Sequence, residues 1–348
     1  MAVKENIFND FKPASLEDWE AAASRELNGA KPMEELVHQA KDWAILPYYN
    51  RKTSLTYAPL LKVSENEFLG ARAWYNCPRL IVEEAKEANQ KALEYLREGA
   101  DGILFEINDE TNFEILLSDI EWQFCSLNFL VKKNQDAIAS ALLDFIAVKK
   151  ISHNHIHGAF FGDIAPSRQI QSHFRLVGYQ MKSAASPVDE IVNGFNSMLA
   201  STKVDFHGKA GLVAFSVGVG TDFFLEVAKL RAIRMLWNRF LAAKSTVNAP
   251  LFIHAHSMRW TDKNYQPHGN MLKGANAAMA AILGGCDALT IDPEDDDQAM
   301  MIRVARNISN ILREESHFSK VADPMAGSYF IEDLTEQLTS AAWKSIHH

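Results

Sequence analysis

The segment LVAFSVGVGTDFFLEVAKLRAIRMLW, residues 212–237, decides the fold class. It opens with the apolar run Leu212 to Val219 and passes into a helical pattern that extends from Asp222 to Ala243. A short apolar run followed by a longer amphipathic stretch is typical of one strand-and-helix unit of a parallel sheet. The run is almost continuously apolar, which is expected for a strand that is covered on both faces.

Seven further apolar runs share this form, and amphipathic patterns such as Val82 to Arg97 and Met300 to Arg313 lie between them. Eight units over about 250 residues match the usual size of a TIM barrel, whereas an open doubly wound sheet usually has fewer strands and a glycine-rich first turn. The sequence therefore predicts an α/β fold with one (β/α)8 TIM barrel over residues 63–348. The other runs are Phe68–Tyr75, Gly102–Ile107, Phe124–Val131, Ile156–Phe161, His173–Met181, Leu251–Ser257 and Ala288–Asp292.

Residues 1–62 follow a different pattern. Ser15 and Asp18 have the spacing of a capping box before the helical run Leu16 to Leu27, which Asn28-Gly29 closes. The stretch after it is rich in aromatic residues and proline but has no sustained period. We expect an extended N-terminal arm with one helix, which lies across the surface of a partner.

The composition excludes several classes of protein. A net charge of -9 leaves no broad basic surface, so we expect neither a nucleic-acid partner nor an anionic membrane. No stretch approaches the roughly 20 apolar residues that span a bilayer. Cys77, Cys125 and Cys286 are far apart and lack CxxC spacing, which argues against a disulfide framework or a zinc knuckle. A cytoplasmic protein is the expectation.

The candidate site follows from the barrel, because ligands bind at the carboxyl ends of its strands. The candidates are therefore the polar residues at the carboxyl ends of the apolar runs. Glu106 and Asp163 are two such residues. The candidate substrate-pocket residues are Tyr179, Gln180, Ser216, His254, His256 and Asp292.

His254 and His256 are two residues apart on one strand, so both side chains point to the same face. They are either hydrogen-bonded interior histidines or, with Asp292, ligands of a metal. A second alternating set, His153, His155 and His157, precedes another run and belongs to the structural end of the barrel. We predict no metal in this chain.

Five long motifs are spread over nearly the whole chain. They are DWEAAASRELNG (Asp18–Gly29), FFLEVAKLRAIRMLW (Phe223–Trp237), NMLKGANAAMAAILGGCDALT (Asn270–Thr290), RVARNISNILREES (Arg303–Ser316) and DPMAGSYFIEDLT (Asp323–Thr335). Together they resemble the methylmalonyl-CoA mutase family. The resemblance implies a TIM barrel that takes an acyl-CoA along its axis, with adenosylcobalamin held against the carboxyl face by a separate domain. It also implies isomerisation of methylmalonyl-CoA and succinyl-CoA through radicals.

The chain departs from the catalytic subunits of that family at the substrate. Those subunits carry G-Y-H-M on strand five, whereas this chain has Gly178-Tyr179-Gln180-Met181. Glutamine cannot act as a general acid, although it can donate a hydrogen bond. Leu212 stands at the position of a CoA-binding arginine and Ala214 at that of a serine, and the tyrosine motif that opens the catalytic barrel is absent from residues 47–75.

The remaining family positions are mixed. His254 and Trp260 match the strand-seven motif, but His256 replaces a glutamine. Asp205-Phe206-His207 begins like the cobalamin signature D-x-H-x-x-G, yet Ala210 stands at the glycine position. The sequence ends at His348, and we expect cobalamin to be held by another polypeptide rather than by this chain.

These observations lead to one hypothesis and two alternatives. The first is the noncatalytic small subunit of a heterodimeric methylmalonyl-CoA mutase, whose partner is the catalytic large subunit. The alternatives are a catalytic acyl-CoA mutase subunit, and a metal-dependent TIM-barrel hydrolase that uses His254, His256 and Asp292. Binding of acyl-CoA by this chain, and a homodimer of the isolated chain, both remain open.

Overall fold

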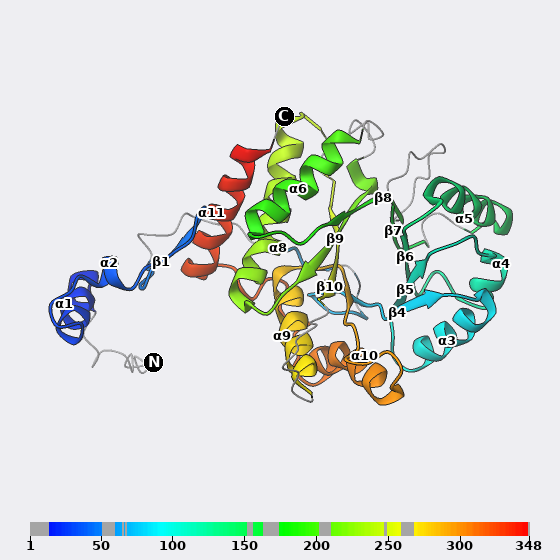
Figure 1. Cartoon of the computed structure of the whole chain (residues 1–348), viewed down its shortest axis with the longest axis horizontal. Coiled ribbons are helices and arrows are strands. Elements are labelled where there is room, and N and C mark those ends of the chain that lie inside the picture. The colour runs from blue at the N-terminus through cyan, green and yellow to red at the C-terminus, as the bar shows by residue number, and fades with distance from the viewer. Residues whose placement is uncertain are drawn as a thin grey trace, which may run out of the picture.

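A computed structural model describes residues 14–50, 60–64, 66, 68–151, 156–162, 174–201, 210–246, 249–258 and 268–346. Its main element is a nine-stranded sheet with the order β3-β11-β10-β9-β8-β7-β6-β5-β4, in which every pair of neighbours is parallel. The sheet curls around an axis, as Figure 1 shows. The strands are β3 (Tyr75–Asn76), β4 (Arg79–Val82), β5 (Gly102–Ile107), β6 (Ser126–Val131), β7 (Gly158–Phe161), β8 (Phe174–Met181), β9 (Val213–Val219), β10 (Phe252–Ser257) and β11 (Ala288–Thr290).

The two outermost strands of the sheet close it into a ring. β3 pairs with β11 and β4 pairs with β5, and only Cys77 and Pro78 separate β3 from β4. The Cys77 amide donates to the Leu289 carbonyl at 2.9 Å, and the Leu104 amide donates to the Pro78 carbonyl at 3.0 Å. Pro78 has no amide hydrogen, which explains the break in the ladder. Residues 75–82 thus act as one first strand, and the predicted (β/α)8 TIM-barrel fold is confirmed.

Seven of the eight predicted runs contain the expected strands, but the first prediction was wrong. Only the last residue of the run Phe68–Tyr75 belongs to the first strand of the barrel, which begins at Tyr75. Phe68 is 85% exposed, and Gly70 has a φ of +83° in a turn that packs against Ser319. The apolar pattern of this run resembles that of a strand. In the structure, however, Gly70 forms a turn and the Phe68 side chain faces solvent, so the segment is not extended.

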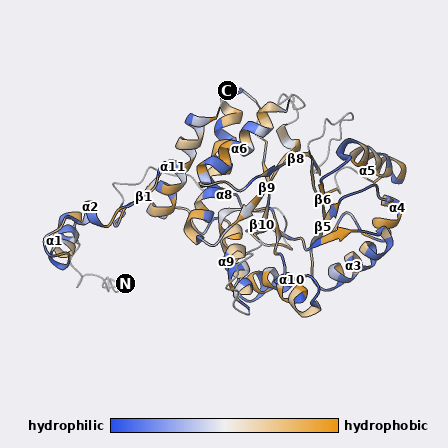
Figure 2. Ribbon diagram, viewed as in Figure 1, coloured by the Kyte–Doolittle hydropathy of each residue, from blue (hydrophilic) through white to orange (hydrophobic). Residues whose placement is uncertain are grey.

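Helices cover the outside of the ring (Figure 1). The predicted helices after the sixth and eighth strands are confirmed as α8 and α10, and α8 begins where the Asp222 side chain accepts the Leu225 amide. Figure 2 shows that β5 is mostly apolar, whereas α3 has a polar outer face. No helix in the described part of the chain is long and apolar enough to cross a membrane. The helices of the barrel are α3 (Ala85–Arg97), α4 (Phe113–Leu116), α5 (Gln135–Lys149), α6 (Pro187–Ala200), α8 (Phe223–Ala243), α9 (Gly269–Gly284), α10 (Ala299–Glu314) and α11 (Tyr329–Ser345), with a 3-10 turn, η2 (Ala210–Leu212), before β9.

The strands bury two separate cores because successive side chains alternate between faces. Phe105 and Phe129 belong to the larger core between the sheet and the helices. A second cluster consists of side chains that point into the ring, and we call it the axial core. Its buried members are Cys77, Leu104, Ala159, Phe161, Ala214, Phe252 and Ala288.

The arm extends away from the barrel (Figure 1). Helix α1 (Leu16–Glu26) has the predicted capping box between Ser15 and Asp18, and none of its residues is buried. The short helix α2 (Pro32–Glu35) and the hairpin of β1 (His38–Gln39) and β2 (Ala44–Ile45) lead back to the barrel. There the Gln337 side chain of α11 accepts the Ala44 amide at 2.8 Å and donates to its carbonyl at 3.0 Å.

Candidate functional site

A cavity of about 240 Å³ lies inside the ring at the carboxyl ends of the strands. Five of the six predicted site residues line it, and Tyr179 does not. Tyr179 follows the alternation of β8, so its ring lies outside the ring of strands at 6.1 Å from the Phe215 ring, while its neighbour Gln180 points inward. The predicted residues that line the cavity are Gln180, Ser216, His254, His256 and Asp292.

The parallel register places these side chains beside one another. Gln180 pairs with Ser216 across β8 and β9, and Ser216 pairs with His254 across β9 and β10. His256 pairs in turn with Thr290 on β11. Polar residues from four neighbouring strands therefore meet at one end of the axis.

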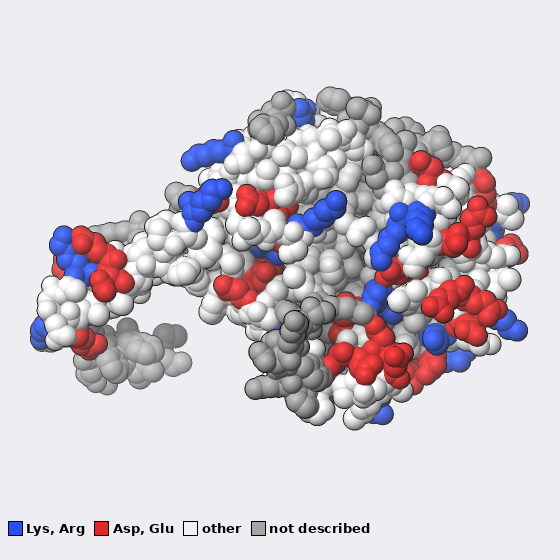
Figure 3. Space-filling view, in the orientation of Figure 1, with Lys and Arg blue, Asp and Glu red and all other residues white. Residues whose placement is uncertain are grey.

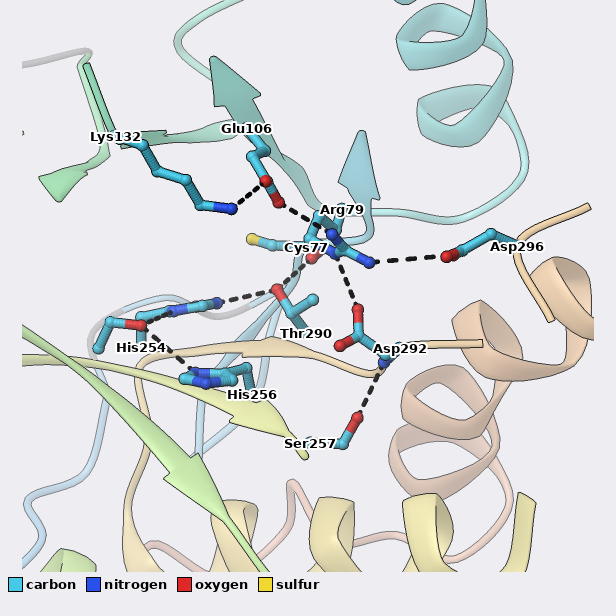
Figure 4. Close-up of polar contacts among 11 residues, drawn as sticks. Cys77, Arg79, Glu106, Lys132, His254, His256, Ser257, Thr290, Asp292 and Asp296 are labelled. Atoms are coloured by element: carbon cyan, nitrogen blue, oxygen red, sulfur yellow. Dashed lines mark hydrogen bonds and ion pairs between the residues drawn. The ribbon is translucent and has the colours of Figure 1, made fainter. Parts of the chain in front are cut away.

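A directed chain of hydrogen bonds connects the histidines (Figure 4). Thr290 Oγ1 donates to the Cys77 carbonyl at 2.6 Å, and it therefore accepts from His254 Nε2 at 2.8 Å. His254 Nδ1 is then the acceptor of the Ser216 hydroxyl at 2.9 Å. That hydroxyl accepts in turn from His256 Nδ1 at 3.4 Å. The fixed carbonyl thus sets the tautomer of both rings.

Both imidazoles are held in the neutral form. Burial lowers the pKa of His254 well below the ordinary value, and the neighbouring His256 lowers it further. Burial also lowers the pKa of His256, although the Asp292 carboxylate opposes the shift. A pair of stacked rings 5.8 Å apart would repel if both were protonated, so the site is not built to hold a positive charge.

Ion pairs close the outer end of the cavity, as Figure 4 shows. Arg79 donates from Nη1 to Glu106 at 2.9 Å and from Nε to Asp292 at 2.9 Å, and its Nη2 lies 3.9 Å from Asp296. Lys132 Nζ donates to the other Glu106 oxygen at 2.5 Å. Burial opposes ionisation of Glu106, but the hydrogen bonds from Lys132 and Arg79 hold its pKa below the ordinary value. We call Arg79, Glu106, Lys132, Asp292 and Asp296 the rim network.

Three members of the rim network, Arg79, Lys132 and Asp296, were not among the candidate site residues. Arg79 belongs to the misplaced first strand, so its inward direction was not apparent. Lys132 directly follows Val131, the last residue of β6, and the rule of carboxyl strand ends would have found it.

The arrangement gives no support to metal chemistry. The Asp292 carboxylate accepts from Arg79, and the Asp292 backbone amide donates to Ser257 Oγ at 2.9 Å. Within the described residues, no group of three or more His, Cys, Asp or Glu side chains could hold a metal ion. His157 forms an isolated bridge with Ser126 at the amino end of the ring, far from the histidines of the cavity along the strands. The other sequence candidates, Asp163, His153, His155, Trp260 and Asp205 to His207, lie outside the described residues.

Two sequence comparisons found similarity to methylmalonyl-CoA mutases. A family model described as methylmalonyl-CoA mutase matches residues 189–348. The methylmalonyl-CoA mutase small subunit of Porphyromonas gingivalis is 27% identical over 98% of this chain and 63% of its own length. The methylmalonyl-CoA mutases of Cereibacter sphaeroides and Rhizobium meliloti are 38% and 37% identical, over 39% and 38% of this chain and 20% of each relative.

The coverage of these relatives differs along the chain. The match to the small subunit includes the arm and the barrel, whereas the two other matches include less than half of the chain. The chain spans about two thirds or less of the length of each relative, 63% for the small subunit and 20% for the other two. The resemblance that the sequence motifs indicated is confirmed.

Proposed function

We propose that this chain, whose resemblance to the methylmalonyl-CoA mutase family extends over nearly its whole length, is the noncatalytic small subunit of a heterodimeric mutase. Its full-length similarity to a small subunit supports this role. The catalytic large subunit is the proposed partner, and it would bind both adenosylcobalamin and the acyl-CoA. The complex would interconvert methylmalonyl-CoA and succinyl-CoA. Three free cysteines, two of them buried, suit the reducing cytoplasm in which we place it.

The filled barrel axis is the observation that carries the proposal. The family resemblance implies that an acyl-CoA lies along the axis, and that path needs an open interior. Here Leu104, Phe161 and Phe252 of the axial core occupy the ring, and each is less than 9% exposed. The cavity above them measures about 240 Å³, below the roughly 300 to 1,000 Å³ of typical small-molecule sites. A cavity of this size argues against a bound pantetheine chain.

The cations of the rim network are paired with carboxylates of the same network. Arg79 and Lys132 both pair with Glu106, so neither is left to bind a carboxylate or a phosphate. Gln180 lines the cavity where the catalytic subunits place a general acid, and it has no titratable proton. These features argue against the alternative of a catalytic acyl-CoA mutase subunit.

The described residues do not fit adenosylcobalamin. His254, which matches a family histidine, is 1% exposed and has both ring nitrogens engaged by Ser216 and Thr290. It therefore offers no lone pair to a metal at the barrel mouth. We assign the binding of this cofactor, and the radical chemistry it supplies when bound, to the large subunit.

The arm, residues 1–62, is the proposed interface with that subunit. Helix α1 buries none of its residues on its own barrel, and Trp19 stacks only partly covered against Tyr48 at 5.1 Å. Both acidic and basic side chains surround α1 on the face seen in Figure 3. A helix that exposes an aromatic ring among mixed charges suits the polar rim and aromatic anchors of a subunit interface.

Co-expression with the large subunit tests the proposal. The isolated chain is expected to show no isomerase activity with adenosylcobalamin. The two chains are expected to co-purify, and the large subunit to lose activity or stability when this chain is removed. Isomerase activity of this chain without a second barrel subunit, or failure to co-purify, would overturn the assignment.

A further inference from the structure

A second and larger cavity, of about 410 Å³, lies at the opposite end of the barrel. Its walls include Leu251, which directly precedes β10, and Asp287, which precedes β11. Trp237 of α8 forms an apolar wall, and Lys62 lies at the exposed mouth. The cavity shares no lining residue with the one at the carboxyl ends, so its chemistry is a separate question.

The lining carries more positive than negative charge. Lys62, Arg72 and Arg234 contribute three cations and Asp287 one anion, which leaves an excess of two positive charges, 3 − 1 = 2, in a chain whose net charge is -9. The Asp287 carboxylate already accepts from Arg234 Nη2 at 2.6 Å and from the Ile253 amide at 2.7 Å. Arg234 is therefore its close partner, and Asp287 attracts Arg72 only at longer range.

Arg72 is the buried cation of this set. It is 7% exposed and donates to the carbonyls of Ile282 at 2.9 Å and Ala73 at 2.8 Å, and also to the carbonyl of Cys286. Neither Arg72 nor Lys62 forms an ion pair with any carboxylate in the ranges that the structure describes. A guanidinium has five N–H groups, and three carbonyls do not use all of them.

Part of this arrangement has a structural role. Ile282, Gly285 and Cys286 lie at the carboxyl end of α9, so Arg72 and Arg234 cap that helix end. The partial charge there is equivalent to about half an elementary charge. Arg234 is also paired with Asp287, so the offset falls mainly to Arg72, which has no carboxylate within ion-pair distance in the described residues and is attracted to Asp287 and Asp323 only at longer range. A buried cation without a close counter-ion is costly.

We propose that this cavity binds a phosphate-bearing ligand. A phosphate dianion matches the two excess charges, with Arg72 at the floor and Lys62 at the mouth as its ligands. Trp237 and Leu251 offer an apolar wall to an organic group beside the phosphate. The volume falls within the roughly 300 to 1,000 Å³ of small-molecule sites.

Calorimetric titration of the full chain with inorganic phosphate and with phenyl phosphate tests the proposal, at an ionic strength matched with sodium chloride. We expect saturable binding at one site. Lys62→Glu should weaken it about tenfold or more, because it replaces a charge-assisted contact by repulsion. Lys86→Glu makes the same change on the exposed face of α3 and should leave the affinity unchanged.

The outcomes separate the sources of the ligand. Tighter binding of phenyl phosphate assigns an organic phosphate, and tighter binding of inorganic phosphate assigns the free ion. Absence of saturable binding for both, or equal weakening by the two lysine substitutions, overturns the proposal. Either result leaves the small-subunit assignment untouched, because that assignment rests on the filled axis at the other end of the barrel and on the similarity to a small subunit.

Discussion

The barrel and the arm differ in how far their side chains are buried. Inside the ring, apolar groups pack against one another, and Arg79, Glu106 and Lys132 satisfy one another's charges. In the arm, α1 is a well-capped helix with no buried residue, and its Trp19 stacks on Tyr48 of the same arm. The described side chains of the barrel thus satisfy one another, whereas the exposed helix of the arm is the surface that we propose a partner covers.

The largest loss of stability is expected from a substitution in the wall of the barrel. Arg231→Ala removes the partner of Asp323 (2.6 Å) and Glu332 (2.9 Å), both at most 3% exposed, and should lower the free energy of unfolding by about 3–5 kcal/mol. Arg239→Ala is the matched control on the same helix. Its ion pair with Glu336 is about one third exposed, so its loss should cost about 1 kcal/mol or less. Equal losses in urea denaturation would contradict a self-contained barrel wall.

The axial core should be nearly as sensitive. Phe161→Ala opens a space in the middle of the ring and should cost about 3–5 kcal/mol in the same denaturation experiment, because the side chain is fully buried. Phe68→Ala removes the same side chain where it is 85% exposed, and it should change stability by less than about 0.5 kcal/mol. A tolerant Phe161 position would mean that the axis is not packed as described.

A smaller effect should appear with pH. The folded chain holds the pKa of His254 below the ordinary 6.5, so the unfolded chain takes up the proton first as the pH falls through that value. Stability is therefore complete above that pH and falls below it, by up to about 1.4 kcal/mol per pH unit for each buried histidine. His254→Gln should flatten this slope in denaturation curves between about pH 7.5 and 5.5.

The arm supplies the control for the pH prediction. His38 is exposed on β1, and His38→Gln is the matched control substitution. If both substitutions flatten the curve equally, the buried histidines are not its source.

The smallest effect on stability should come from α1. Trp19→Ala should change the free energy of unfolding by less than about 0.5 kcal/mol, because α1 buries no residue on its own chain. The same substitution should weaken co-purification with the large subunit, while Glu20→Ala on the same helix should not. A loss of stability without a loss of association would assign the arm to this barrel rather than to a partner.

Much of the fold was predictable because most strands are short apolar runs followed by amphipathic helices. The first strand was not, because Pro78 interrupts its ladder and Arg79 gives it a charged inward face. Several residues that line the cavity at the carboxyl ends were predicted from the sequence. The rule of carboxyl strand ends located Ser216, His254 and their neighbours, but it could not tell which of two adjacent residues, Tyr179 or Gln180, points inward.

The polar contacts themselves were beyond the sequence. The direction of the hydrogen-bond chain depends on the Cys77 carbonyl, which becomes its end point only when β3 closes the ring beside β11. Asp292 was expected near the histidines, and it lines the same cavity, but the guanidinium of Arg79 determines its role. Such contacts depend on pairing between strands that are far apart in the sequence. The local hydrophobic pattern of each strand does not predict that pairing.

Calorimetric titration of the isolated chain with methylmalonyl-CoA tests the central claim most directly. An axis filled by Leu104, Phe161 and Phe252 predicts no saturable heat at any concentration that saturates a catalytic mutase. Saturable binding of one methylmalonyl-CoA per chain would contradict the claim, because the ligand could enter the ring only if these packed side chains moved apart.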